Sequence, residues 1–108
     1  INSGGEKIHP EEVEAVLREH PAVYDAIVVG APDERWGERV TAVVSTRLGP
    51  EVGAEDLAEE LAEHCRSRLA DYKAPRSVLI VDEVQRHESG KVYQGWARLV
   101  AARAHIGR

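Results

Sequence analysis

Along the chain, apolar residues recur either at the spacing of a helix face or in the short runs typical of strands. The first helical pattern follows Pro10 and two glutamates, and its apolar stripe consists of Val13, Val16 and Leu17. The strand-like runs are rich in Val, Ile and Ala and are bounded by turn-forming residues. The pattern predicts six elements: helix 10–19, strand 22–29, strand 38–47, helix 54–70, strand 77–81 and helix 93–104.

This order of elements predicts a small α+β domain with a three-stranded sheet flanked by helices. The strand 77–81 is apolar without interruption from Val78 onward, so we expect it at the centre of the sheet. Residues 1–7, which include Gly4 and Gly5, are interpreted as a flexible entry loop, and residues 30–33 as a loop that ends the first strand. A length of 108 residues is typical of one domain.

The charge of the chain is unevenly distributed around a net value of −5. Residues 85–108 carry five Arg or Lys against one Glu, whereas residues 1–84 carry nine against eighteen acidic residues. A globally acidic domain is a poor candidate for binding nucleic acid, and a local cationic patch suits a small polyanion. Because no apolar run approaches the ~20 residues that span a bilayer, we expect no transmembrane segment and a cytoplasmic protein.

The residues that could hold a metal are few and dispersed. Cys65 is the only cysteine, which excludes an internal disulfide and a cysteine-based metal cluster, and we expect it to be a small core residue. The five histidines are scattered, and none forms an H-x-x-x-H pair. We therefore expect no metal site in this chain.

Three polar or aromatic segments allow both a functional and a structural interpretation. The segment 86–91 ends in Lys91, which could reach a phosphate or carboxylate in a neighbouring site, or could be a solvated lysine in an ordinary turn. Trp36 is either a local hydrophobic anchor or a flat surface for a ligand. Tyr72, close in sequence to Arg76, either covers the edge of the core or stacks on a nucleobase beside a phosphate.

Five short motifs occur in a fixed order along the chain. They are 3–14 (SGGEKIHPEEVE), 20–23 (HPAV), 29–38 (VGAPDERWGE), 72–75 (YKAP) and 89–91 (SGK). Together they resemble the C-terminal domain of the acyl-adenylate-forming (AMP-binding) enzymes, which include acyl-CoA synthetases, luciferases and the adenylation domains of peptide synthetases. The resemblance covers nearly the whole chain and is of the acyl-CoA synthetase type.

The resemblance implies that residues 1–108 are the mobile C-terminal domain of an acyl-CoA synthetase whose N-terminal ATP- and acyl-binding domain is absent. In such enzymes a carboxylic acid, here expected to be a fatty acid, reacts with MgATP to give an acyl-adenylate and pyrophosphate. The thiol of CoA then displaces AMP. The implied partners are the N-terminal domain, the acid, ATP and CoA, and Mg²⁺ is expected on the absent domain. The fragment alone is expected to be inactive.

The resemblance also assigns roles to individual residues. Lys91 matches the adenylation lysine, and Gly90 supports its loop. Gly4 and Gly5 match a glycine loop that lines the pantetheine tunnel, where a side chain would obstruct the thiol. Lys7 occupies a polar position that in relatives holds the adenylate or orders this loop.

A second group of matches concerns CoA. Trp36 and Tyr72 match aromatic positions that in related CoA ligases lie near the CoA nucleotide, and Arg76 matches a basic neighbour. Ala74 stands where some relatives carry arginine, which places one phosphate contact in doubt.

The chain departs from the family pattern near its end. Residues 85–91 read QRHESGK instead of Pro-Arg-x-x-x-Gly-Lys. The pieces Val84-Gln85-Arg86 and Trp96-Ala97 resemble a variant of actinobacterial long-chain or steroid side-chain acyl-CoA ligases. Two alternatives to the CoA ligase stay open. One is an adenylation domain that passes its acyl group to a carrier protein, and the other is a non-catalytic interaction domain of the same fold.

Overall fold

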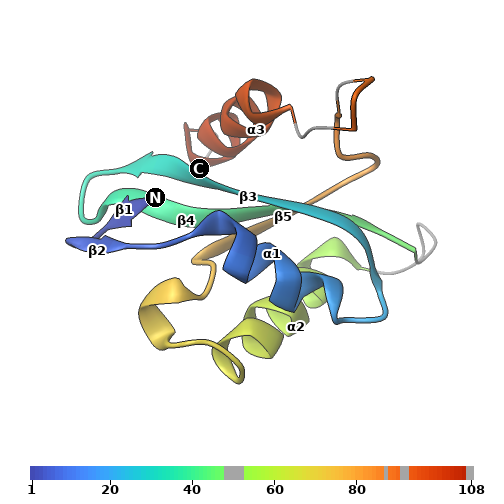
Figure 1. The fold of residues 1–108 in the computed structure, drawn as a ribbon, viewed down its shortest axis with the longest axis horizontal. Helices are drawn as coiled ribbons and strands as arrows, with labels where there is room; N and C mark the ends of the chain where they lie inside the picture. The colour runs from blue at the N-terminus through green and yellow to red at the C-terminus, as the bar shows by residue number, and fades with distance from the viewer. Residues whose placement is uncertain (48–52, 87, 91–92, 107–108) are drawn as a thin grey trace.

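The computed structural model of the chain describes residues 1–47, 53–86, 88–90 and 93–106. A mixed β-sheet lies between two layers of helices, with α1 and α2 on one face and α3 on the other (Figure 1). In chain order the elements are β1 (Asn2–Ser3), β2 (Glu6–Lys7), α1 (Pro10–Arg18), β3 (Val23–Asp33), β4 (Gly37–Thr46), α2 (Ala54–Arg66), the 3₁₀ helix η1 (Asp71–Lys73), β5 (Ser77–Val81) and α3 (Gln94–Ile106).

The α+β class and all six elements expected from the sequence are confirmed. The first helix begins at Pro10, as the proline and the two glutamates of its first turn predict. The second helix ends at Arg66, four residues earlier than expected. Within the described part of the chain, no helix has both the length and the apolar character needed to cross a membrane.

The prediction that the strand 77–81 is central is wrong. β4 is the central strand, because it pairs with β3 and β1 in antiparallel fashion and with β5 in parallel fashion. β5 pairs with β4 alone among the described strands. Its apolar run has another cause: Val78 and Ile80 pack toward α1 and α2, whereas Leu79 and Val81 pack toward α3. Both faces of this edge strand are thus covered by helices.

Two segments interpreted as loops are strands. Residues 1–7 form a hairpin in which β1 pairs with β2, and Ser3 also pairs with Gly37 of β4. Over the residues described, this hairpin gives the sheet five strands instead of the three that the sequence predicted. β3 continues through 30–33 to Asp33, which pairs with Gly37. Pro32 is compatible with this extension because β3 lies at the edge of the sheet, where a missing backbone donor is tolerated.

The sheet separates two hydrophobic clusters. The larger cluster joins α1, α2 and the sheet, and its fully buried side chains include Leu17, Leu61 and Cys65. Cys65 is a core residue as expected, and burial raises the pKa of its thiol to about 11, so it is not a nucleophile at neutral pH. The smaller cluster lies under α3, which contributes Ala97 and Ala101.

Candidate functional site

The Gly4–Gly5 pair forms the two-residue turn between β1 and β2. Both glycines have positive φ, 59° and 87°, which is the conformation that a tight hairpin of this length requires. The two positions differ in their surroundings. A Cβ on Gly4 would lie 2.8 Å from Cε3 of Trp36, whereas a Cβ on Gly5 would meet no atom within 4 Å. Gly4 is therefore needed for packing inside the domain, and Gly5 faces open space.

Trp36 lies in the turn between β3 and β4, and Asp33 holds that turn. One carboxylate oxygen of Asp33 accepts hydrogen bonds from the backbone N–H groups of Arg35 (2.8 Å) and Trp36 (3.0 Å). The other accepts one from Nη1 of Arg39 at 3.2 Å. Desolvation by itself would raise the pKa of Asp33, but these donors outweigh it and lower the pKa. Asp33 therefore stays ionised and fixes the turn.

Two guanidinium groups surround the indole of Trp36. Cζ of Arg76 lies 3.8 Å from the ring centroid, and Cζ of Arg35 lies at 4.9 Å. The backbone N–H of Arg76 donates to the carbonyl of Val40 at 2.9 Å, which ties this residue to the central strand. The backbone N–H of Gly4 donates to the carbonyl of Trp36 at 2.8 Å. The structure thus brings together Gly4, Trp36 and Arg76, and it adds Arg35 to them. We call these four residues the Trp36 cluster.

Among the described residues, no hydrogen bond, ion pair or cation–π contact joins Tyr72 or Lys7 to the Trp36 cluster. Tyr72 lies on η1 and is 39% exposed, and its ring is 5.8 Å from Nζ of Lys73. Lys7 is exposed on β2. Ala74 is only 4% exposed and belongs to the larger core cluster, so this position faces the core and not a phosphate.

The segment between Gln85 and Tyr93, which we call the lysine loop, precedes α3 and contains the expected adenylation lysine. Lys91 itself lies outside the described residues. Gly90 has a φ of 84°, and a Cβ there would meet no atom within 4 Å, so glycine is required at this position by the backbone conformation. The loop is closed at its base by a hydrogen bond of 3.1 Å from the N–H of Tyr93 to the carbonyl of Gln85.

The lysine loop and the Gly4–Gly5 turn lie at opposite ends of the molecule. In Figure 1 the β1–β2 hairpin is at one end of the long axis and the segment 88–90 is near the other. The domain measures 37 Å along this axis. The two features therefore cannot occupy one small pocket in the same orientation of the domain.

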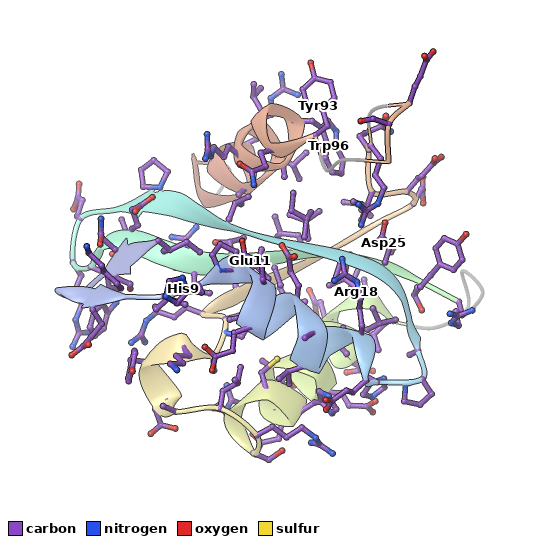
Figure 2. All side chains as sticks on the ribbon, in the orientation of Figure 1. His9, Glu11, Arg18, Asp25, Tyr93 and Trp96 are labelled. Carbon is purple, nitrogen blue, oxygen red and sulfur yellow. The ribbon has the colours of Figure 1, made fainter. Side chains whose placement is uncertain are left out.

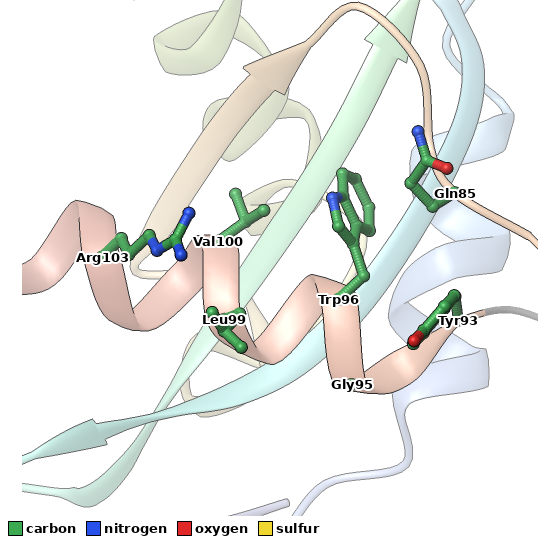
Figure 3. Close-up of a pocket in the computed structure, with 7 residues that line it drawn as sticks. All are labelled: Gln85, Tyr93, Gly95, Trp96, Leu99, Val100 and Arg103. Carbon is green, nitrogen blue, oxygen red and sulfur yellow. The ribbon is translucent and has the colours of Figure 1, made fainter.

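A groove with a mainly apolar lining lies beside α3. Its volume is about 520 Å³, and Figure 3 shows the side chains that line it. Tyr93 is 47% exposed and Leu99 is 51% exposed, whereas Trp96 is partly buried against the smaller core cluster. No group of three or more His, Cys, Asp or Glu suited to a metal ion occurs in the described ranges.

Two residues around Trp36 are not assigned a role by the sequence patterns. Arg35 is adjacent to Trp36 in sequence, but adjacency alone does not indicate that its guanidinium lies over the indole. Asp33 lies in the predicted loop, and the available signal is that an aspartate at the start of a turn commonly accepts a hydrogen bond from the backbone two residues later.

Comparisons with known proteins identify the family of the chain. Residues 12–91 match the family described as AMP-binding enzyme C-terminal domain. The chain is 55% identical over 98 residues to a 3-oxocholest-4-en-26-oate–CoA ligase of Rhodococcus rhodochrous, covering 91% of this chain and 17% of that protein. It is 52% identical over 98 residues to a medium/long-chain-fatty-acid–CoA/3-oxocholest-4-en-26-oate–CoA ligase of Mycolicibacterium smegmatis, with the same coverage.

A solved structure supports the same assignment. The fatty acyl CoA synthetase of Mycobacterium tuberculosis superposes with a TM-score of 0.84 at 35% identity, covering 96% of this chain and 20% of that one. The chain thus spans about a fifth or less of the length of these relatives. From the family match and these identities, the chain belongs to the C-terminal domain family of the AMP-binding enzymes.

Proposed function

We propose that this chain is the catalytic lid of an AMP-forming acyl-CoA synthetase and acts in both half-reactions of the enzyme. The observation that carries the proposal is the identity of 55% to a CoA ligase over 98 residues. The placement of the Gly4–Gly5 turn and the lysine loop at opposite ends of the domain supports two docked orientations, one for each half-reaction.

In the first half-reaction, a carboxylate oxygen attacks the α-phosphorus of ATP, and the bond to the pyrophosphate leaving group breaks. Two anions approach each other, and negative charge develops on the phosphoryl oxygens. The ammonium group of Lys91 would lie against the carboxylate and the α-phosphate and would stabilise this charge. Mg²⁺, where required, would be held by the larger N-terminal part of the enzyme.

In the second half-reaction, the thiol of CoA attacks the acyl carbonyl, and AMP leaves. The Trp36 cluster would receive the nucleotide end of CoA. The two guanidinium groups would turn from the indole to donate to the phosphates, and the ring face that they leave would stack on the base. Gly5 faces open space and would leave room for the pantetheine arm. Tyr72 and Lys7 would contact the bound ligand from outside the Trp36 cluster.

Our proposal for the substrate class rests on the relatives alone. Their names specify medium- and long-chain fatty acids and a steroid side-chain acid. We propose an apolar carboxylic acid of this kind as the substrate, and ATP and CoA as co-substrates in the cytoplasm.

The test is an assay of the natural full-length protein that contains this chain. With a long-chain fatty acid or a steroid C26 acid, we expect acid-dependent ATP–pyrophosphate exchange and formation of the acyl-CoA. A truncated protein that lacks residues 1–108 should form no acyl-CoA. Transfer of the acyl group only to the pantetheine thiol of a carrier protein would favour the carrier alternative, and the absence of both half-reactions would favour a non-catalytic domain.

Trp36→Ala should weaken CoA binding selectively. Loss of a stacking surface typically costs 1–3 kcal/mol, so we expect KM for CoA to rise roughly tenfold, while pyrophosphate exchange stays within about twofold. Tyr24→Ala is the matched control, because Tyr24 is also partly exposed beside an arginine, with Arg47 Cζ 5.3 Å from its ring. An unchanged KM for CoA in the Trp36 variant would remove this assignment.

A further inference from the structure

A bidentate ion pair joins the lysine loop to the distant strand β3. Nε of Arg86 donates to Oδ2 of Asp25 at 2.6 Å, and Nη2 donates to Oδ1 at 2.6 Å. The two residues are 61 positions apart in sequence. Their side chains are only 30% and 18% exposed. A bidentate arginine–carboxylate pair that is partly shielded from solvent fixes the relative orientation of its two side chains more strictly than an exposed ion pair does.

Asp25 is itself held in place by its neighbours. Its Oδ1 accepts the backbone N–H of Ala26 at 2.9 Å and lies 3.5 Å from Nη2 of Arg18. The same Nη2 of Arg18 donates to the carbonyl of Ala26 at 2.8 Å, so α1 and β3 are joined at this point. Figure 2 shows Asp25 and Arg18 beside each other at this end of the sheet. Asp25 is therefore a fixed anchor and not a freely rotating acid.

A second acid, Glu14, completes the network from α1. Its Oε2 accepts the backbone N–H of Val28 at 2.9 Å, and its Oε1 lies 4.0 Å from Nη1 of Arg18. Desolvation raises the pKa of Glu14. At Asp25, desolvation opposes ionisation, but the hydrogen bonds from Arg86 and Ala26 outweigh it and lower the pKa. The hydrogen bonds to Asp25 raise the pKa of Arg86, so this pair stays charged at neutral pH.

The third nitrogen of the Arg86 guanidinium, Nη1, makes a hydrogen bond within the lysine loop. Nη1 of Arg86 donates to the carbonyl oxygen of Gly90 at 3.0 Å. That carbonyl belongs to the peptide group that joins Gly90 to Lys91. Arg86 therefore bonds the fixed anchor Asp25 with two donors and the peptide group next to Lys91 with a third. An ammonium group could not replace this planar arrangement, because all its donors radiate from one atom.

We infer that Arg86 is a positioning residue for adenylation, and that it transmits the position of Asp25 on β3 to the peptide group from which Lys91 extends. This inference rests on the proposed role of Lys91. It assigns Arg86 and Asp25 no contact with substrate. The fixed point that the structure describes is the Gly90 carbonyl. A displacement of about 1 Å at a reacting group can cost roughly 10²-fold in rate, so loss of this fixed point should be measurable.

The test uses three variants of the full-length enzyme: Arg86→Ala, Arg86→Lys and Asp25→Asn. We expect kcat for pyrophosphate exchange to fall about tenfold in each, with KM for ATP and for the acid within about twofold, because orientation and not binding is lost. Acyl-CoA formation from preformed acyl-adenylate should stay within about twofold. Arg86→Lys is informative even if Arg86→Ala folds poorly, because it keeps the charge and removes the fork.

A second measurement separates positioning from general stability. In a Lys91→Ala background, Arg86→Ala should cause no further loss of exchange, because Arg86 acts through Lys91. Arg66→Ala is the control for the loss of an arginine from an ion pair elsewhere in the domain. Nε and Nη2 of Arg66 both donate to one oxygen of Glu63 (Oε2, 3.2 and 2.7 Å) on α2, across the sheet from the lysine loop, so this variant should leave both half-reactions unchanged.

The outcomes also distinguish this inference from the proposed function. If Lys91→Ala lowers exchange but the Arg86 and Asp25 variants do not, the positioning role is wrong and the function stands. If Lys91→Ala leaves exchange unchanged, the proposed function fails first. Equal losses in both half-reactions, or an additive loss in the Lys91→Ala background, would overturn the positioning role in favour of a structural one.

Discussion

Lys91→Ala in the full-length enzyme is expected to lower acid-dependent pyrophosphate exchange roughly 10²-fold or more, by analogy with the removal of other preorganised donors from a charged transition state. The loss should appear mainly in kcat, because the charge that the ammonium stabilises develops during the reaction. Acyl-CoA formation from preformed acyl-adenylate should be largely retained, since the proposed second orientation turns the lysine loop away from the site.

Two controls sharpen this prediction. Lys91→Arg keeps the positive charge but changes its geometry, so a partial recovery would identify charge as the main contribution. Acetylation of Lys91 removes the charge and should reproduce the alanine variant. Equal losses in both half-reactions would contradict a role confined to adenylation.

Gly5→Leu is expected to produce the reverse pattern. A side chain at this exposed position of the β1–β2 turn would project into open space, where we place the pantetheine arm of CoA. We expect acyl-CoA formation from preformed acyl-adenylate to fall roughly 10²-fold, with pyrophosphate exchange close to the unsubstituted level.

The φ of 87° at Gly5 makes a second variant necessary. Any side chain there incurs backbone strain of roughly 1–2 kcal/mol, so Gly5→Ala measures the strain with little added bulk. The additional loss of acyl-CoA formation in Gly5→Leu relative to Gly5→Ala then measures the obstruction by the larger side chain. If Gly5→Leu still forms acyl-CoA at the normal rate, the glycine turn does not line the path of the thiol.

Local patterns predicted the elements of this domain well where many residues share one periodicity. The helix from Pro10 was predicted from its proline, its first-turn acids and its apolar stripe. The strands that contain Val28 and Val43 were predicted from their runs of β-branched residues. The hairpin at residues 1–7 was missed because each of its strands has only two residues, too few for an alternating pattern. The Gly4–Gly5 pair was the available signal, and it was assigned to a flexible loop.

The candidate site could be predicted only residue by residue. The family resemblance identified Trp36 and Arg76 separately, but their stacking depends on β4 and β5 lying side by side, which no local pattern specifies. The link between Asp25 and Arg86 likewise joins residues that are 61 positions apart. Lys91 stays a prediction, because it lies outside the described residues.

The opposed positions of the glycine hairpin and the lysine loop have a kinetic consequence. If each end must face the same nucleotide pocket in turn, the domain has to rotate out and back once for every molecule of product. Such domain motions occur on the microsecond-to-millisecond timescale and often limit turnover. Solvent viscosity should therefore slow the complete cycle of the enzyme more than it slows either half-reaction measured alone.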